Sequence, residues 1–430
     1  MKQLEYQHGF GNHFSAEALT GALPEGQNSP KDPPFGLYAE QLSGTAFTVP
    51  RAENRRTWFY RIRPSVVAEN FRPYEHKHSK TSPEQMMLAS PNQLRWRAPA
   101  IPRRKTDFVD GLRVYAHAGC PDKGEGMAVY LYAANQSMTD RFFYSADGEF
   151  LIVPQEGGLE IRTEMGVMKV SPQEIALIPR GVKFQVRLLD NSARGYICEN
   201  FGQPLRLPDL GPIGANGLAN PRDFCTPVPA FTDEQGSFTQ LCKMDGRLWQ
   251  AGIKNNPLDV VAWHGNYVPC KYDLRRFNAM NTVTYDHPDP SIFTVLTSPS
   301  ETTGVANADF VIFPPRWSVA ENTFRPPYYH RNIMSEFMGL IVGDYDGKKS
   351  GFEPGGASLH SRMAAHGPDK QTFDAALNTP EGPHKLENTM AFMFETRHLL
   401  RVTQQAVKLK TLDTTYAKCW QGLESRFTGR

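Results

Sequence analysis

Short apolar segments alternate with turn signals along much of this chain. Between Met127 and Phe201 the strand-length segments MAVYLYAAN, FLIVPQ and EIALIP are separated by Asp-Gly, Gly-Gly and Pro-Arg-Gly turns. Serial short strands with close turns are typical of antiparallel sandwiches and small barrels. The pattern therefore predicts a mainly β protein with few helices.

Strand-like segments also occur outside this region. WFYRIRPS begins at Trp58, and IFTVLTSP, FVIFPPRWSV and TMAFMFETRHLLRVT follow in the last third of the chain. We expect two domains, residues 1–286 and 287–430, the second closed by residues 389–403. Helix is predicted for part of 231–250 and for 416–427, where aromatic residues recur at helical spacing and serve core or subunit packing.

A polar face interrupts the apolar pattern near Glu336. His330 lies six residues earlier, which is about 600° around a helix but the same face of a strand. The spacing therefore predicts a strand, with Ile333 and Phe337 directed toward a core. Its polar face comprises Tyr328, His330, Asn332, Met334 and Glu336.

An imidazole and a carboxylate on one strand, with a second histidine further on, form a ligand set that suits Fe(II). Such a 2-His-1-carboxylate set leaves coordination positions open for substrate and O₂. His360 follows the PGGAS turn and His366 precedes the GPD turn. Spacing alone leaves both histidines open as the third ligand.

Composition and charge exclude several classes of protein. The 430 residues carry a net charge of only +2, and the basic residues are scattered, so neither nucleic acid nor an anionic membrane is an expected partner. We expect no secretory signal and no membrane span, hence a cytoplasmic protein. The six cysteines form no C-x₂-C pair, which favours reduced structural thiols.

The strings RPPYYHRNIMSEFMGLI and PGGASLHSRMAAHGPD resemble the homogentisate 1,2-dioxygenase family, as do YQHGFGNHFSAEAL and WFYRIRPS near the N-terminus. The resemblance covers nearly the whole chain. It implies an Fe(II) enzyme that opens the homogentisate ring with O₂ to give maleylacetoacetate in tyrosine and phenylalanine breakdown. It also implies a homo-oligomer, a hexamer built as a dimer of trimers.

The resemblance further implies roles for individual residues. The iron ligands of the family match His330, Glu336 and His366 here, and His287 in YDHPDP matches the acid–base histidine. His360 then becomes a catalytic or substrate-facing group beside the metal. Substrate contacts are expected from side chains that share the ligand face or its cavity: Tyr328, Asn332, Tyr345 and His366, with Tyr345 also assisting catalysis.

The N-terminal half carries two further signals. PRGVKF resembles the second metal motif of cupins, double-stranded β-helix or jelly-roll barrels, but Phe184 stands at the position of the metal-binding histidine. A metal-free barrel behind an irregular segment of about sixty residues is therefore predicted. In addition, Ser65–His78 echoes Ser318–Asn332, with His76 opposite His330; duplication and chance remain equally open.

Two other functions are compatible with these patterns. One is a gentisate-type ring-cleaving dioxygenase. The other is a non-catalytic, two-barrel cupin that binds or stores small molecules. An anionic ligand such as Glu336 opposite two histidines favours the enzyme, because a storage protein has no use for it.

Overall fold

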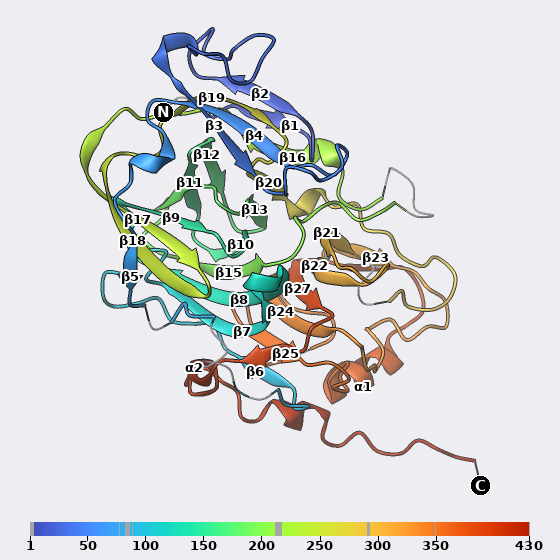
Figure 1. Ribbon diagram of the computed structural model, residues 1–430. Helices are drawn as coiled ribbons and strands as arrows, with labels where there is room; N and C mark the ends of the chain where they lie inside the picture. Colours follow the sequence, from blue (N-terminus) through green and yellow to red (C-terminus); the bar gives the residue numbers. More distant parts are fainter. Residues whose placement is uncertain are drawn as a thin grey trace.

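The computed structural model describes residues 4–76, 78–81, 87, 89–210, 217–289, 293–348 and 350–429. Its strands form four sheets of four or more strands and one small ribbon (Figure 1). Pairing is antiparallel in every described ladder except β9 with β17. The predicted fold class, mainly β with few helices, is confirmed.

Two large sheets build the N-terminal barrel. The nine-stranded sheet has the order β1 (Tyr6–His8), β16 (Phe224–Pro227), β20 (Cys270–Asp273), β13 (Glu174–Ile178), β10 (Glu149–Glu156), β15 (Ala193–Asn200), β8 (Glu125–Ala134), β7 (Leu112–Cys120) and β28 (Arg401–Val402). The seven-stranded sheet has the order β12 (Gly166–Val170), β11 (Leu159–Thr163), β14 (Phe184–Leu188), β9 (Arg141–Ser145), β17 (Gln235–Met244), β18 (Arg247–Asn255) and β5 (Arg72–Tyr74).

The remaining sheets are smaller. A four-stranded sheet has the order β2 (Phe14–Glu17), β19 (Val260–Gly265), β4 (Arg56–Arg61) and β3 (Tyr38–Ser43). A six-stranded sheet has the order β21 (Thr294–Pro299), β22 (Ala306–Phe313), β27 (Thr389–Thr396), β24 (Ser335–Gly343), β25 (Ala357–His360) and β6 (Leu94–Trp96). The ribbon pairs β23 (Arg316–Ser318) with β26 (His384–Leu386).

Helices are short in the described part of the chain. The α-helices are α1 (Lys370–Asn378) and α2 (Gln404–Val407). Short 3-10 helices are η1 (Pro34–Gly36), η2 (Ser65–Val67), η4 (Pro121–Lys123), η6 (Pro221–Asp223), η7 (Leu274–Arg276) and η8 (Tyr416–Trp420). None of the helices in these residues is long and apolar enough to cross a membrane.

The strands predicted between Met127 and Phe201 are all present, but the turns between them are of two kinds: one joins paired strands, and the others join strands of different sheets. Only the turn at 164–166 closes a hairpin, β11 with β12. The turns at 147–148, 157–158 and 179–181 carry the chain from one large sheet to the other, because the strands before and after them belong to different sheets. This alternation wraps the barrel around an aromatic core that includes Phe184, whose ring lies 5.5 Å from that of Phe143.

Two sequence predictions of helices are wrong. Residues 231–250 contain no helix; they form most of the β17–β18 hairpin, since the Asp245-Gly246 turn supplies two residues with positive φ. The C-terminal helix shrinks to η8, and Phe427 is 83% exposed. The predicted irregular N-terminal segment is present, since turns and loops make up most of it, but it also contains β1, β2 and β3, which pair with β16, β19 and β4.

The two halves exchange strands. β6, from the N-terminal half, forms one edge of the six-stranded sheet through β25, and β28, from the C-terminal end, pairs with β7. The core between the nine- and six-stranded sheets is continuous and includes Trp96, Tyr196 and Phe337. One face of the six-stranded sheet is thus sealed, and its other face is available for a site. The division at residue 286 stays a prediction.

Candidate metal centre

The far face of the six-stranded sheet carries the polar cluster. Glu336 is the second residue of β24, and its neighbour Phe337 is fully buried in the inter-sheet core. Because side chains alternate along a strand, Glu336 points to the opposite face. There it is only 4% exposed, and in register it faces His360 of β25 and Glu395 of β27.

The predicted strand through His330 is wrong in its extent. β24 begins only at Ser335, and Ile333, expected to point to a core, is 55% exposed. His330 instead lies in a loop that meets the loop of His366. The two residues exchange both backbone hydrogen bonds, at 3.0 and 3.1 Å, as a single isolated bridge. This non-local bridge, rather than a shared strand face, brings the two imidazoles together.

The two imidazoles are oriented in the same way. Nδ1 of His330 lies 2.8 Å from the carbonyl oxygen of Tyr328, and Nδ1 of His366 lies 2.8 Å from that of Ala364. A carbonyl only accepts, so each Nδ1 carries the proton and donates it. Each Nε2 points toward Glu336, and that of His366 is hydrogen-bonded to the carboxylate at 2.8 Å. A metal ion would take the place of this hydrogen bond, which is the usual arrangement of metal-binding histidines.

The donor atoms of these residues converge. Nε2 of His366 lies 2.8 Å from Oε2 of Glu336, and Nε2 of His330 lies 3.9 Å from Oε1. Donors held about 2.1 Å from one cation at right angles would lie about 3 Å apart, which these distances bracket. Within the described residues, His330, Glu336 and His366 are the group of three whose ligand atoms all lie within 4.8 Å of one another. The donor set fits one metal ion.

Asn332 supports the carboxylate. Its Nδ2 donates to Oε1 of Glu336 at 3.1 Å and to Oε1 of Glu395 at 2.7 Å. Burial alone would raise the pKa of Glu336, but His366, His330 and the Asn332 amide together lower it. The carboxylate is consequently ionised at neutral pH.

His360 lies beside this group and is not part of it. Its ring stacks on that of His366, with the ring centroids 4.0 Å apart, and its Nε2 lies 2.9 Å from the hydroxyl of Tyr416. Its Nδ1 is buried without a hydrogen-bond partner, 3.9 Å from Oε2 of Glu336. Burial lowers the pKa of His360 well below its usual value, so the ring is neutral.

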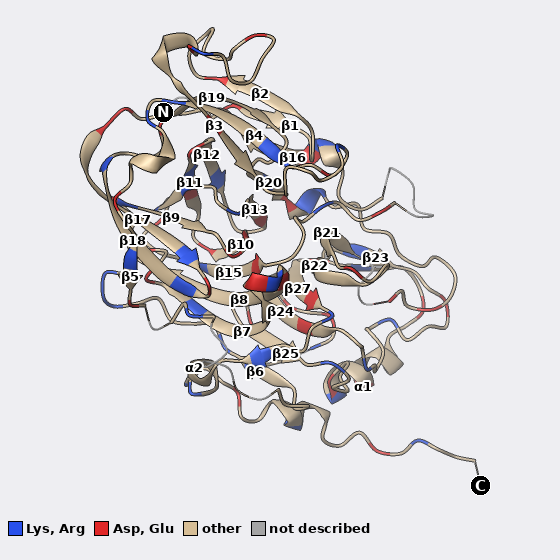
Figure 2. Ribbon diagram, viewed as in Figure 1, with Lys and Arg blue, Asp and Glu red and all other residues tan. Residues whose placement is uncertain are grey.

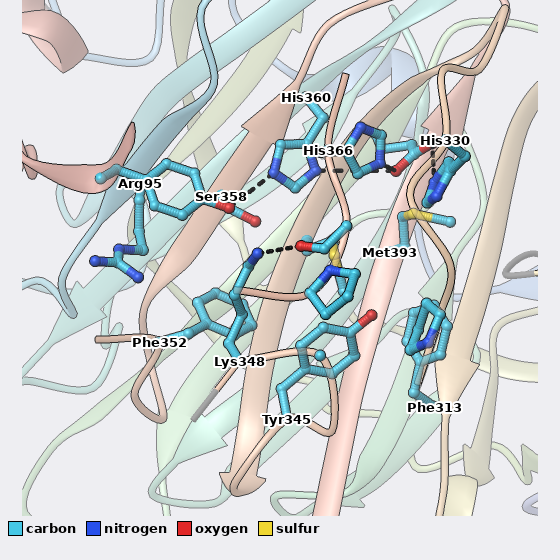
Figure 3. Close-up of a pocket in the computed structure, with 17 residues that line it drawn as sticks. Arg95, Phe313, His330, Tyr345, Lys348, Phe352, Ser358, His360, His366 and Met393 are labelled. Atoms are coloured by element: carbon cyan, nitrogen blue, oxygen red, sulfur yellow. Dashed lines mark hydrogen bonds and ion pairs between the residues drawn. The ribbon is translucent and has the colours of Figure 1, made fainter. Parts of the chain in front are cut away.

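A pocket opens in front of the cluster (Figure 3). The three histidines lie along one side, and Phe313, Tyr345 and Lys348 lie across from them. Burial keeps the pKa of Tyr345 well above its usual value, so its hydroxyl is a neutral donor. The lining residues are Arg95, Phe313, Pro327, His330, Glu336, Met338, Tyr345, Gly347, Lys348, Phe352, Ser358, His360, His366, Gly367, Pro368, Met393 and Tyr416.

Three residues with predicted roles do not line this pocket. Tyr328 is 37% exposed and donates its hydroxyl to Oδ1 of Asp289 at 2.6 Å. Asn332 is engaged by two carboxylates. Nδ1 of His287 lies 2.6 Å from the Pro288 carbonyl oxygen, and its ring lies 6.5 Å from that of Tyr328. Their predicted roles stay predictions.

Sequence reasoning missed several residues of the pocket. Tyr416 was assigned to packing alone, yet its hydroxyl contacts His360. Arg95 and Lys348 received no role, although both line the cavity. Arg95 enters on β6 and Tyr416 on η8, far in sequence from the histidines. No local sequence motif identifies these residues as part of the pocket.

Together, a β-sheet face and a buried two-histidine, one-carboxylate cluster define a class of metal site that non-haem Fe(II) oxygenases use. Comparison with protein families gives a more specific assignment. Residues 5–274 match the homogentisate 1,2-dioxygenase N-terminal family model, and residues 275–427 match the C-terminal one. The chain belongs to the homogentisate 1,2-dioxygenase family, and its activity is the ring-cleaving dioxygenation of homogentisate.

Solved structures of low sequence identity are also similar to this chain. The protein Ylba from E. coli shares 9% identity over 73% of this chain and 94% of its own, with a TM-score of 0.31. A putative dioxygenase from Nostoc punctiforme shares 12% identity over 80% and 91%, with a TM-score of 0.26. The bacterial pirin YhhW from Escherichia coli, in complex with nickel(II), shares 10% identity over 76% and 99%, with a TM-score of 0.25.

Proposed function

We propose that His330, Glu336 and His366 hold one Fe(II) ion at which homogentisate and O₂ react. The observation that carries this assignment is the orientation of the imidazoles, each with Nδ1 bound to a backbone carbonyl and Nε2 directed toward Glu336. A redox-active iron supplies the electronic link between the electron-rich diol ring and O₂. The product of ring opening is maleylacetoacetate.

The pocket walls suit an aromatic ring with polar substituents. Phe313, Phe352 and Met393 provide apolar contact for the ring. The neutral hydroxyl of Tyr345 donates to a substrate or oxygen atom in the cavity. Nδ1 of His360 has no hydrogen-bond partner and lies 3.9 Å from Oε2 of Glu336, which supports a role for His360 beside the metal. His366 is proposed to border the substrate as well as to hold the ion.

We assign His287 as the general base for a substrate hydroxyl. Burial lowers the pKa of this imidazole, so it is neutral and able to accept a proton at neutral pH. The ring of Tyr328 lies between the two imidazoles, with its centroid 6.5 Å from that of His287 and 6.0 Å from that of His330. Tyr328 is proposed to contact the substrate from this position.

The protein is further proposed to act in the cytoplasm as a hexamer, a dimer of trimers. Large apolar side chains on the N-terminal segment support an assembled state, because Phe35 is 65% exposed and Phe47 77% exposed in the single chain. Sedimentation or mass photometry of the purified protein tests this assembly.

Metal analysis of protein purified without oxygen, followed by O₂ uptake with homogentisate, tests the proposed site. We expect one iron per chain and one O₂ consumed per homogentisate. Zinc or nickel in place of iron in the active protein, or uptake that persists after chelation, would contradict the assignment.

A further inference from the structure

A buried lysine lies on the wall of the pocket across from the histidines. Lys348 is 8% exposed and lines the cavity with Tyr345 and Phe352 (Figure 3). We propose that its ammonium group recognises the carboxylate on the side chain of the substrate and thereby selects acidic diols. The proposal rests on the proposed function and adds a specificity-determining residue to it.

The surroundings of Lys348 hold the ammonium without neutralising it. Nζ donates to the carbonyl oxygen of Gly367 and lies 4.4 Å from the ring centroid of Trp420 and 5.8 Å from that of Tyr416. The aromatic faces stabilise a cation. The Gly367 carbonyl occupies only one of the three N–H donors of the ammonium. No carboxylate among the residues that the structure describes lies within 4 Å of Nζ.

The neighbouring cation in the same pocket is different. Nη2 of Arg95 lies 2.5 Å and Nε 3.0 Å from Oδ2 of Asp413, so its charge is already balanced. A buried ammonium without such a partner is rare, because desolvation favours its neutral form. Burial does lower the pKa of Lys348, to about 8, with Cys419 and Asp369 opposing the shift and Arg95 adding to it. The group is still charged at neutral pH.

The placement matches a substrate that carries both a diol and an acid. A ring bound with its hydroxyls toward His330 and His366 lies between the apolar side chains of Met393 and Phe352. Its other end then meets Lys348, on the opposite side of the cavity (Figure 3). An acidic side chain completes the missing ion pair, whereas a neutral one leaves the ammonium desolvated and unpaired.

The test compares two ligands that differ in the carboxylate, homogentisate and methylhydroquinone. Their dissociation constants are measured by calorimetry without oxygen on the iron-loaded wild type and on Lys348→Met. We expect the variant to bind homogentisate about 10- to 100-fold more weakly, the range for a lost hydrogen bond to a charged group. Binding of methylhydroquinone should change less than about twofold, and Lys348→Arg should recover part of the loss.

A matched control is Lys385→Met. Lys385 also lies over a tryptophan ring, 5.8 Å from that of Trp317, but its ammonium is half exposed and pairs with Glu387 at 2.6 Å. This variant should bind both ligands like the wild type. An equal loss of both ligands in Lys348→Met, or no loss of either, overturns the proposal.

A second measurement needs no variant and so does not depend on its folding. On the wild type, 4-hydroxyphenylacetate should displace bound homogentisate at least about tenfold better than 4-methylphenol, and equal displacement contradicts the proposal. Both experiments measure binding. Failure of the proposed function instead appears as wild-type protein that holds iron and binds homogentisate but consumes no O₂ with it.

Discussion

The N-terminal barrel and the C-terminal pocket both bury charged side chains, but they satisfy them in opposite ways. In the barrel, Lys243 lies between the two large sheets with Nζ 2.6 Å from Asp147 and 3.0 Å from Glu199. All four carboxylate oxygens are occupied, with backbone amides of Asp245 and Gly246 on Asp147 and hydroxyls of Ser145 and Tyr130 on Glu199. Nothing in this cluster is left for a ligand.

In the pocket, the same kind of burial leaves binding capacity open. Nε2 of His330 and Nε2 of His366 point at Glu336, where a metal ion would take the place of the His366–Glu336 hydrogen bond, and Nδ1 of His360 has no partner. Figure 2 shows that acidic and basic residues are distributed over both halves of the molecule. The distribution of charge therefore does not distinguish the barrel from the pocket. The difference is therefore one of internal pairing: the barrel cluster stabilises the fold, whereas the pocket cluster needs an external partner.

The largest effect is expected from breaking the metal centre. Replacement of His330, Glu336 or His366 by Ala should abolish iron retention and activity, a loss exceeding the roughly 10- to 100-fold seen when an outer-shell partner is removed. The β core does not include these residues, so far-UV circular dichroism should be unchanged. Iron content after anaerobic purification is the measurement.

His76→Ala is the control for that experiment. His76 stands opposite His330 in the sequence echo, but its ring nitrogens lie 2.7 Å from the Ser79 hydroxyl and 3.3 Å from the Asp110 carbonyl oxygen. The variant should keep one iron per chain. Two irons in the wild type, or iron lost from this variant, would overturn the assignment of the site to the C-terminal pocket.

The next effect concerns the proposed base. His287→Asn should keep iron and bind homogentisate, yet lower kcat by about 10²- to 10⁴-fold, the usual contribution of general acid–base catalysis. Because burial lowers the pKa of His287, the active neutral form persists to below pH 6.5 and is lost as the pH falls through that lowered pKa. The wild-type profile should therefore have an acid limb that the variant lacks.

Two results would redirect this assignment. If His287→Asn retains wild-type kcat at every pH, the residue is a structural turn histidine and the base is to be sought at His360. If the variant loses its iron, the ring supports the metal loop through Tyr328 instead. Tyr345→Phe should lower kcat more mildly, since a hydrogen bond rather than a proton transfer is removed.

The barrel cluster gives a third test of the comparison. Lys243→Met leaves Asp147 and Glu199 buried without their cation, and removal of one partner of a buried ion pair costs about 3 to 5 kcal/mol. We expect a lower urea midpoint, with iron content and kcat unchanged below the transition. Lys254→Met is the control, because that side chain is 83% exposed and should shift stability by less than about 0.5 kcal/mol.

Loss of iron from folded Lys243→Met would break the comparison, because it would couple the barrel cluster to the metal centre. An unchanged urea midpoint would instead show that the buried pair contributes nothing to stability.

Local sequence was sufficient for the strands but not for their arrangement. The run from Met127 to Phe201 predicts its strands because apolar segments end at clear turn residues. It does not reveal which turns close hairpins and which change sheets, since both use the same Gly-containing sequences. The pairing of β6 with β25 and of β28 with β7 could not be predicted from local sequence either, because the paired strands lie hundreds of residues apart.

The site shows the same limit. The types of ligand were readable from the motif strings, and the prediction that Phe337 is buried is confirmed. The strand drawn through His330 was wrong because the Oδ1 of Asn332 accepts from the amide of Met334 and forms a turn before β24. The backbone bridge to His366 is what holds His330 near Glu336. Lys348 and Tyr416 also line the pocket, but they belong to segments that carry no recognisable motif.

The smallest effect concerns Asn332, for which the sequence and the structure suggest different roles. The sequence predicts a substrate contact, whose loss raises KM for homogentisate and leaves iron affinity unchanged. The hydrogen bonds to Glu336 and Glu395 favour a positioning role, whose loss weakens iron binding by about 10- to 100-fold. Asn332→Ala separates these outcomes when iron affinity is measured by competition with a chelator and KM is measured at saturating iron.

We expect the positioning role to prevail. Because Nδ2 is shared between two carboxylates that are neighbours across β24 and β27, its loss lets Glu336 turn away from His366, and excess iron should then restore most of kcat. Asn332→Asp should be worse than Ala, since it places a third carboxylate against Glu336 and Glu395. An Ala variant with wild-type iron affinity and a raised KM would return Asn332 to the substrate-binding residues.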